Sequence, residues 1–148
     1  MYEIYTDGAY SSSKDAGGTS AIILKDNKII QKLYQGYHHT TNNRCEIMAT
    51  IMALEYFKNP ETIKIYSDSS YVVNTINNGW AKKWFEEQDF SKKNLDLWFK
   101  LIDLIDFHDV EFVWVKGHAD NENNCGADML AQHACNCLNL KEDICISD

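Results

Sequence analysis

The order of extended and helical segments is the feature that most restricts the fold of this chain. Residues 2–6 alternate in polarity, residues 19–25 are apolar and β-branched, and a third extended run covers residues 28–37 after a turn at Asp26-Asn27. Consecutive strands joined by short turns run antiparallel, so these segments predict an antiparallel meander. The serine- and glycine-rich residues 10–18 are expected to form a flexible loop between the first two strands.

Helices and strands alternate in the rest of the chain. Apolar spacing predicts helices at residues 42–58, 69–77, 95–105 and 124–138, and strands at 63–66 and 111–115. Together these elements predict an α/β fold with a five-stranded mixed sheet, three antiparallel strands followed by two parallel ones, flanked by helices. We place a single domain at residues 1–140 and a short, frayed C-terminal tail at residues 141–148.

Cysteine usage and hydropathy indicate the compartment. The five cysteines are an odd number without framework spacing, so we interpret them as free thiols in a reducing, cytoplasmic environment. Cys135-x-Cys137 is a weak alternative as a metal pair, because no histidine supports it. No apolar run approaches the roughly 20 residues of a membrane span, and no signal pattern begins the chain. We expect a monomer with neither a membrane nor a protein partner.

The charge balance is uneven along the chain. A formal net charge of −8 argues against nucleic-acid binding, because contacts to phosphate need lysine and arginine. Residues 80–93 nevertheless carry four lysines against three acids and form a modest basic segment in an acidic chain. Metal ions bound by acids elsewhere would offset part of the negative charge.

Four acids stand at predicted strand ends or near helix starts: Asp7, Glu46, Asp68 and Asp128. Each has a structural alternative. Asp7-Gly8 could be a hairpin turn, Glu46 a capping-box residue, Asp68 an N-cap, and Asp128 an acid favoured by the helix dipole. Ligands of open α/β sheets bind at such edges, so the four acids together predict one shared site.

Carboxylates in such a group suit divalent cations. Hard oxygen ligands favour Mg²⁺, with Mn²⁺ as a possible substitute. Two ions about 4 Å apart can orient an attacking water and stabilise charge on both reacting oxygens of a phosphodiester. The sequence shows no Ser/His/Asp or Cys/His arrangement and no GxxxxGK[ST] phosphate loop that would compete. We therefore interpret the four acids as a two-metal phosphodiesterase site.

Four blocks of sequence carry a resemblance to a known family. They are Tyr5-Thr6-Asp7-Gly8-Ala9, Thr40 to Ala49 (TTNNRCEIMA), Tyr66 to Val72 (YSDSSYV), and Val115-Lys116-Gly117-His118-Ala119 followed by Ala127-Asp128. With these blocks the chain resembles a type 1 ribonuclease H, of the ribonuclease H-like superfamily, from Tyr5 to about Leu138. The resemblance implies endonucleolytic cleavage of the RNA strand of an RNA–DNA hybrid, which leaves a 3′-hydroxyl and a 5′-phosphate.

The resemblance also implies a role for each catalytic residue. Asp7 would bridge both ions, Asp128 would complete the site of the water-activating ion, and Glu46 and Asp68 would hold the second ion. Glu46 would also lie near the 2′-hydroxyl that distinguishes RNA from DNA. His118 would shuttle a proton or assist product departure, unless it is an ordinary surface histidine.

The expected substrate contacts follow from the same resemblance. Asn42 and Asn43 would contact the minor groove, with helix capping as a compatible alternative. A basic protrusion that binds the DNA strand would be formed by Trp80, Lys82, Lys83 and Trp84. The alternative for a tryptophan is packing beneath a helix, and we prefer this alternative for Trp98.

Three departures from the family pattern bear on substrate binding. Ser13 stands where the family usually has asparagine, so one groove contact of the family is not matched. Ser70 stands where glutamine is common, which shortens another contact to a base edge. The acids Glu86, Glu87 and Asp89 dilute the protrusion and predict salt-sensitive binding.

Two other functions remain open at this point. One is a catalytically silent nucleic-acid-binding module on the same fold, and the other is a two-metal nuclease that acts on DNA. The complete set of acids with His118 favours an enzyme, and the paired asparagines with the tryptophan–lysine protrusion favour a hybrid substrate.

Overall fold

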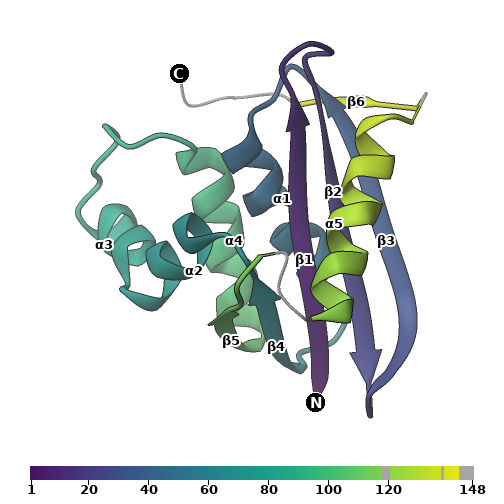
Figure 1. The fold of residues 1–148 in the computed structure, drawn as a ribbon. Helices are drawn as coiled ribbons and strands as arrows, with labels where there is room; N and C mark the ends of the chain where they lie inside the picture. Colours follow the sequence, from purple (N-terminus) through teal and green to yellow (C-terminus); the bar gives the residue numbers. More distant parts are fainter. Residues whose placement is uncertain (118–120, 138, 144–148) are drawn as a thin grey trace.

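A six-stranded mixed sheet with the order β5-β4-β1-β2-β3-β6 forms the centre of the computed structural model (Figure 1). The structure describes residues 1–117, 121–137 and 139–143. The strands are β1 Tyr2–Ser11, β2 Ala16–Lys25, β3 Lys28–His38, β4 Thr62–Ser67, β5 Asp109–Trp114 and β6 Lys141–Glu142. β1, β2 and β3 pair antiparallel, whereas β4 runs parallel to β1 and β5 runs parallel to β4. The predicted arrangement of the first five strands is therefore confirmed.

The sixth strand corrects the prediction of a five-stranded sheet. Lys141 and Glu142 pair parallel with Tyr37 and His38 at the end of β3. Residues 141–143 are consequently not a frayed tail: the sheet holds two of them, and the Asp143 carboxylate lies 2.7 Å from Nε of Arg44 in α1. This pairing joins distant parts of the chain, so no local pattern in the sequence predicts it.

The first connection is also shorter than predicted. β1 runs to Ser11 and β2 begins at Ala16, so most of the predicted loop belongs to the strands. The glycines there serve close packing: a Cβ on Gly17 would lie 2.4 Å from the Cys45 sulfur, and one on Gly18 would lie 2.0 Å from the Ala131 carbonyl oxygen. Helices on both faces approach β2 at these two positions.

The described part of the chain contains five helices. They are α1 Asn42–Glu55, α2 Ser70–Asn77, α3 Trp80–Glu86, α4 Leu95–Phe107 and α5 Glu122–Cys135. Of these, α3 packs on α2 and α4 rather than on the sheet. Four match predicted helices with shifted ends, whereas α3 falls in a segment for which no element was predicted. α5 lies on one face of β1–β3 and α1 on the other, as Figure 1 shows. Among the described residues, no helix is both long and apolar enough to cross a bilayer.

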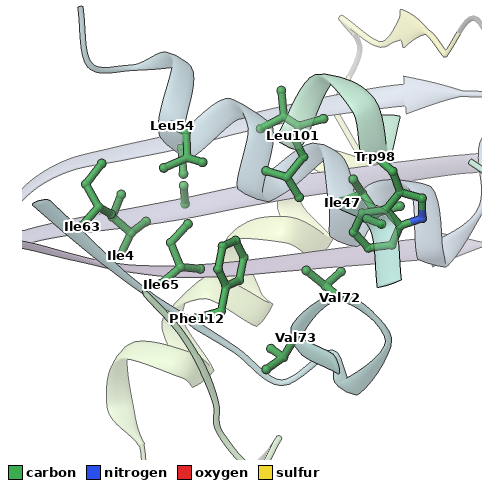
Figure 2. Close-up of a cluster of buried hydrophobic side chains, with 14 of the residues drawn as sticks. Ile4, Ile47, Leu54, Ile63, Ile65, Val72, Val73, Trp98, Leu101 and Phe112 are labelled. Carbon is green, nitrogen blue, oxygen red and sulfur yellow. The ribbon is translucent and has the colours of Figure 1, made fainter. Parts of the chain in front are cut away.

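The main core lies between the sheet and the helices α1, α2 and α4. Figure 2 shows Ile4 of β1 and Ile65 of β4 facing Ile47 and Leu54 of α1. Trp98 of α4 has no exposed surface, which confirms its prediction as a core residue. This core fixes α1 against β1, and α1 carries one of the four candidate acids.

Candidate active site

Asp7 lies inside β1 rather than at its end. It pairs with Ser20 of β2, and β1 continues for four residues beyond it. The expectation that a strand stops there is therefore wrong, and so is the hairpin-turn alternative. The apolar alternation fades after Thr6 because residues 8–11 line a polar hollow and do not belong to the main core.

Asp68 follows the carboxyl end of the neighbouring parallel strand. β4 ends at Ser67, which pairs with Thr6 immediately before Asp7. The N-cap of α2 is Ser69, whose hydroxyl accepts a hydrogen bond from the Val72 backbone N–H at 3.2 Å. Asp68 is therefore not the N-cap, and its position at the strand end brings it beside Asp7.

Glu46 comes from the second turn of α1. The N-cap of that helix is Thr41, whose hydroxyl accepts from the Arg44 N–H at 3.1 Å, so the capping-box alternative for Glu46 is wrong. A Cβ added to Gly8 would lie 2.6 Å from the Glu46 backbone nitrogen. Only glycine at this position lets α1 approach β1 closely enough to set Glu46 against Asp7.

These three acids form a compact cluster. Oxygen atoms of Asp7, Glu46 and Asp68 all lie within 4.8 Å of one another. Asp7 and Glu46 are only 4% and 8% exposed, and Asp68 is half-buried. Acids at such short range repel one another when they are ionised, so the cluster is suited to holding cations.

The pKa values of the buried pair reflect this repulsion. Burial, reinforced by the charge of Asp68, raises the pKa of Asp7 to about 7. Burial raises the pKa of Glu46 well above its ordinary value, and the charges of Asp7 and Asp68 add to the effect. Without cations the cluster therefore retains protons near neutral pH, and a divalent ion would displace them.

Asp128 approaches the cluster from the opposite face of the sheet. It is the seventh residue of α5, beyond the first turn in which the helix dipole favours an acid, so the dipole does not account for its position. Its charge contributes to the raised pKa of Asp7. Its carboxylate accepts from Nε2 of Gln132 at 3.2 and 3.4 Å, a contact that the i, i+4 spacing could have indicated.

A polar hollow of about 460 Å³ adjoins Asp128. We call it the α5 groove: its lining residues are Gly8, Ala9, Tyr10, Ser11, Lys14, Asn42, Asp128, Gln132, Cys135 and Asn136. Asn42 and Asn43 are exposed at the start of α1, and Thr41 rather than either asparagine caps the helix. The capping alternative for the asparagines is therefore wrong, and Asn42 faces the groove.

Arg44 anchors the start of α1 through buried ion pairs. Its buried guanidinium lies 2.8 Å from Asp96 of α4 and 2.7 Å from Asp143 after β6. Thr40 also donates to Asp143, at 2.7 Å. This network ties the segment that carries Asn42 and Glu46 to two distant parts of the chain, and sequence reasoning missed it.

The predicted protrusion is the region around α3. Trp80 is 46% exposed, and Lys82 and Lys83 are exposed. Trp84 is half-buried and packs against the main core, so for this residue the packing alternative holds in part. Nζ of Lys92 lies 5.7 Å from the Trp84 ring centroid.

Three candidate residues remain, Ser13, Ser70 and His118. Ser13 and Ser70 are exposed. His118 lies outside the described residues. A Cβ on Gly117 would be 2.9 Å from Oδ2 of Asp68, so the chain just before His118 passes close to the acid cluster.

Comparison with known proteins identifies the family. The family model described as RNase H matches residues 1–136. The chain belongs to the RNase H family. It is 44% identical to a ribonuclease H of Trichodesmium erythraeum over 146 residues, which cover 95% of this chain and 92% of that one. It is 46% identical to a ribonuclease H of Chlorobium phaeovibrioides over 136 residues, covering 88% and 92%. The predicted resemblance is thus confirmed.

Solved structures show the same fold. LC9-RNase H1, described as a type 1 RNase H with the type 2 active-site motif, aligns with a TM-score of 0.78 at 24% identity, covering 90% of this chain and 71% of that one. RNase H1 of Halobacterium salinarum aligns with a TM-score of 0.70 at 22% identity, covering 90% and 96%. Membership of the RNase H family makes this chain a metal-dependent nuclease, a phosphodiester hydrolase.

Proposed function

We propose that this protein cleaves the RNA strand of RNA–DNA hybrids endonucleolytically and leaves 3′-hydroxyl and 5′-phosphate ends. The observation that carries the proposal is the cluster of Asp7, Glu46 and Asp68, with oxygens within 4.8 Å of one another and with Asp128 close enough to raise the pKa of Asp7. Relatives named ribonuclease H at 44% and 46% identity support the same activity. A structural neighbour, LC11-RNase H1 in complex with an RNA/DNA hybrid, shares the fold with a TM-score of 0.73 at 21% identity, covering 91% of this chain and 96% of that one.

The donor set fits two Mg²⁺ ions, with Mn²⁺ as a substitute. Asp7, Glu46, Asp68 and Asp128 offer only carboxylate oxygens, which hard divalent ions prefer. In this proposal Asp7 would help to hold both ions, Asp128 would help to hold the first, and Glu46 and Asp68 would help to hold the second. Two divalent ions, when bound, orient a water and stabilise charge on the attacking and leaving oxygens.

The chain itself positions and orients the reacting groups. Buried Asp7 and Glu46 are held by β1 and α1, so their oxygens are fixed before substrate binds. Gln132 holds Asp128 through its amide. Glu46 is proposed to lie near the ribose 2′-hydroxyl, and His118 to move a proton or assist product departure.

Substrate binding is proposed to use two surfaces. Asn42 and Asn43 contact the minor groove, where amides both donate and accept hydrogen bonds, and Ser13 and Ser70 make shorter contacts. Trp80, Lys82, Lys83 and Trp84 grip the DNA strand, chiefly through exposed Trp80 and the two lysines. We propose that the protein is cytoplasmic, because the four cysteines among the described residues are free thiols: Cys45, Cys125, Cys135 and Cys137. A monomer is proposed as the default state.

A cleavage assay separates this proposal from its alternatives. Labelled RNA–DNA hybrid, double-stranded RNA and double-stranded DNA are incubated with the protein, with and without Mg²⁺. The proposal predicts cleavage of the RNA strand of the hybrid alone, and only with the metal. Binding without cleavage would instead support a silent module, and cleavage of double-stranded DNA would support a DNA nuclease.

A further inference from the structure

The α5 groove extends from Asp128 to the turn between β1 and β2. Tyr10 and Ser11 of β1 line one side, and Gln132 of α5 and Asn136, the C-cap of that helix, line the other. Lys14, in the turn, is the one positively charged residue among the described residues that line the groove. A single cation therefore faces a polar hollow that begins at a catalytic acid.

A row of contacts along α5 leads to this lysine. Gln132 donates to Asp128, Asn136 donates to the Gln132 carbonyl at 3.0 Å, and the Lys14 ammonium donates to the Asn136 side-chain oxygen. Asp128, Gln132 and Asn136 are spaced four residues apart and so lie on one helical face. Eight residues of helix span about 12 Å. This distance corresponds to about four nucleotides along one strand, so the ammonium and the Asp128 carboxylate are about four nucleotides apart.

We propose that Lys14 binds a backbone phosphate of the cut strand in the α5 groove, within about four nucleotides of the scissile bond. The inference rests on the proposed function. The strand that is cut must pass Asp128, so its backbone is the one that can continue into the groove. An acidic chain with a net charge of −8 attracts a polyanion weakly, which makes a cation beside the acids valuable for binding.

The neighbouring acid does not neutralise this lysine through a contact within the turn. Asp15 accepts from the Tyr10 hydroxyl at 3.0 Å and lies 3.8 Å from Nε2 of His39. Lys14 is exposed, and its contact on α5 is the neutral Asn136 amide. A phosphate oxygen can therefore join the amide as a partner of the ammonium.

Steady-state kinetics of Lys14→Ala and Lys14→Glu test the proposal. Lys28→Ala and Lys28→Glu are matched controls, because Lys28 is an exposed lysine beside the turn at the opposite end of β2. We expect Lys14→Ala to raise KM on hybrid by about three- to tenfold and to leave kcat within twofold. The slope of log(1/KM) against log[salt] should become shallower by about one. Lys14→Glu should have a larger effect, and the Lys28 variants should match wild type.

Two results would overturn the inference without affecting the proposed function. In the first, wild type cleaves hybrid and the Lys14 variants have the same KM and salt slope as wild type. In the second, the Lys28 variants raise KM as much as the Lys14 variants do. A wild-type protein that cleaves no hybrid would instead refute the proposed function itself. Melting curves of every variant show whether the exposed turn tolerates the substitutions.

A substrate scan tests which strand the lysine contacts. Hybrids that carry one neutral methylphosphonate at successive positions are compared for wild type and Lys14→Ala. At one position on the RNA strand, near the cut, the neutral linkage should raise the wild-type KM but leave the KM of Lys14→Ala unchanged. A position with this behaviour only on the DNA strand, or on neither strand, contradicts the proposal.

Discussion

Replacing Asp7 with asparagine should stabilise the metal-free protein although it abolishes activity. Asparagine has the same shape and keeps the acceptor for the Gly8 N–H, which lies 2.9 Å from Oδ1 of Asp7. It removes a carboxylate that burial and two neighbouring acids disfavour. Stability and function are therefore expected to change in opposite directions.

The size of the effect follows from the pKa. In the folded protein the pKa of Asp7 is about 7, against an ordinary value of 3.8. A raised pKa means that the folded state binds the proton more tightly, so the penalty is absent below pH 3.8 and grows as pH rises toward 7. At pH 7.5 the difference corresponds to about 4 kcal/mol, and at pH 4.5 to about 1 kcal/mol.

Thermal melting in EDTA measures this penalty. For a chain of this length, 4 kcal/mol corresponds to a rise of roughly 8–16 °C, which is a ceiling because Asp7 and Glu46 share their protons. We expect Asp7→Asn to melt at least about 5 °C above wild type at pH 7.5, with a much smaller gain at pH 4.5. Asp103→Asn, which removes one exposed charge from α4, should shift the melting temperature little at either pH.

Mg²⁺ should raise the melting temperature of the wild-type protein more than that of the Asp7→Asn variant. The ion offsets the repulsion in the wild-type cluster, so it should raise the wild-type melting temperature at pH 7.5, less so at pH 4.5 where protons compete. The Asp7→Asn protein should respond weakly and should not cleave hybrid. An Asp7→Asn protein that melts at or below wild type in EDTA at pH 7.5, or that keeps normal turnover, would refute the reasoning.

Two further variants test other parts of the structure. Asp143→Asn leaves the buried Arg44 guanidinium short of a counter-charge and should lower the free energy of unfolding in urea by about 2 kcal/mol; the exposed Glu142→Gln should cost well under half of that, and equal losses would contradict a special role for Asp143. The Lys82→Ala/Lys83→Ala double variant should raise KM and flatten its salt dependence, with kcat nearly unchanged. A salt slope equal to that of wild type would remove these lysines from substrate binding.

Local patterns in the sequence predicted most of the fold. Alternation and β-branched runs indicated β1–β3, and helical spacing indicated α1, α2, α4 and α5, because these signals depend only on which face of an element is buried. Trp98 followed from the same spacing. β6 could not be predicted from the sequence, because Lys141 and Glu142 have no strand pattern. Pairing with β3 and the contact of Asp143 with Arg44 hold this strand in place.

The errors in the sequence interpretation have physical reasons. Asp7-Gly8 resembles a turn, yet Gly8 serves the close approach of α1 to a continuous strand. Thr41, rather than Asn43, caps α1, so Glu46 was free for the site. The Gly8 contact depends on a partner from another element, which the sequence does not show. The cap of α1 is local, but Thr41 and the two asparagines after it are all residue types that cap helices, so the sequence does not choose between them.

The four acids could be selected from motifs, but their chemistry could not be calculated from the sequence. The raised pKa of Asp7 depends on its burial and on the distances to Asp68 and Asp128, which exist only in the folded chain. The contact of Gln132 with Asp128 and the position of Lys14 beside α5 likewise come from the structure.

A crystal structure with Mn²⁺ and bound hybrid tests the central claim most directly, because anomalous scattering locates the ions without assumptions. The account predicts two Mn²⁺ peaks that share an oxygen of Asp7, one of them also contacting Asp128 and the other contacting Glu46 and Asp68. Anomalous peaks that lie away from these carboxylates, or a cluster without metal under conditions in which the enzyme cleaves hybrid, would contradict it.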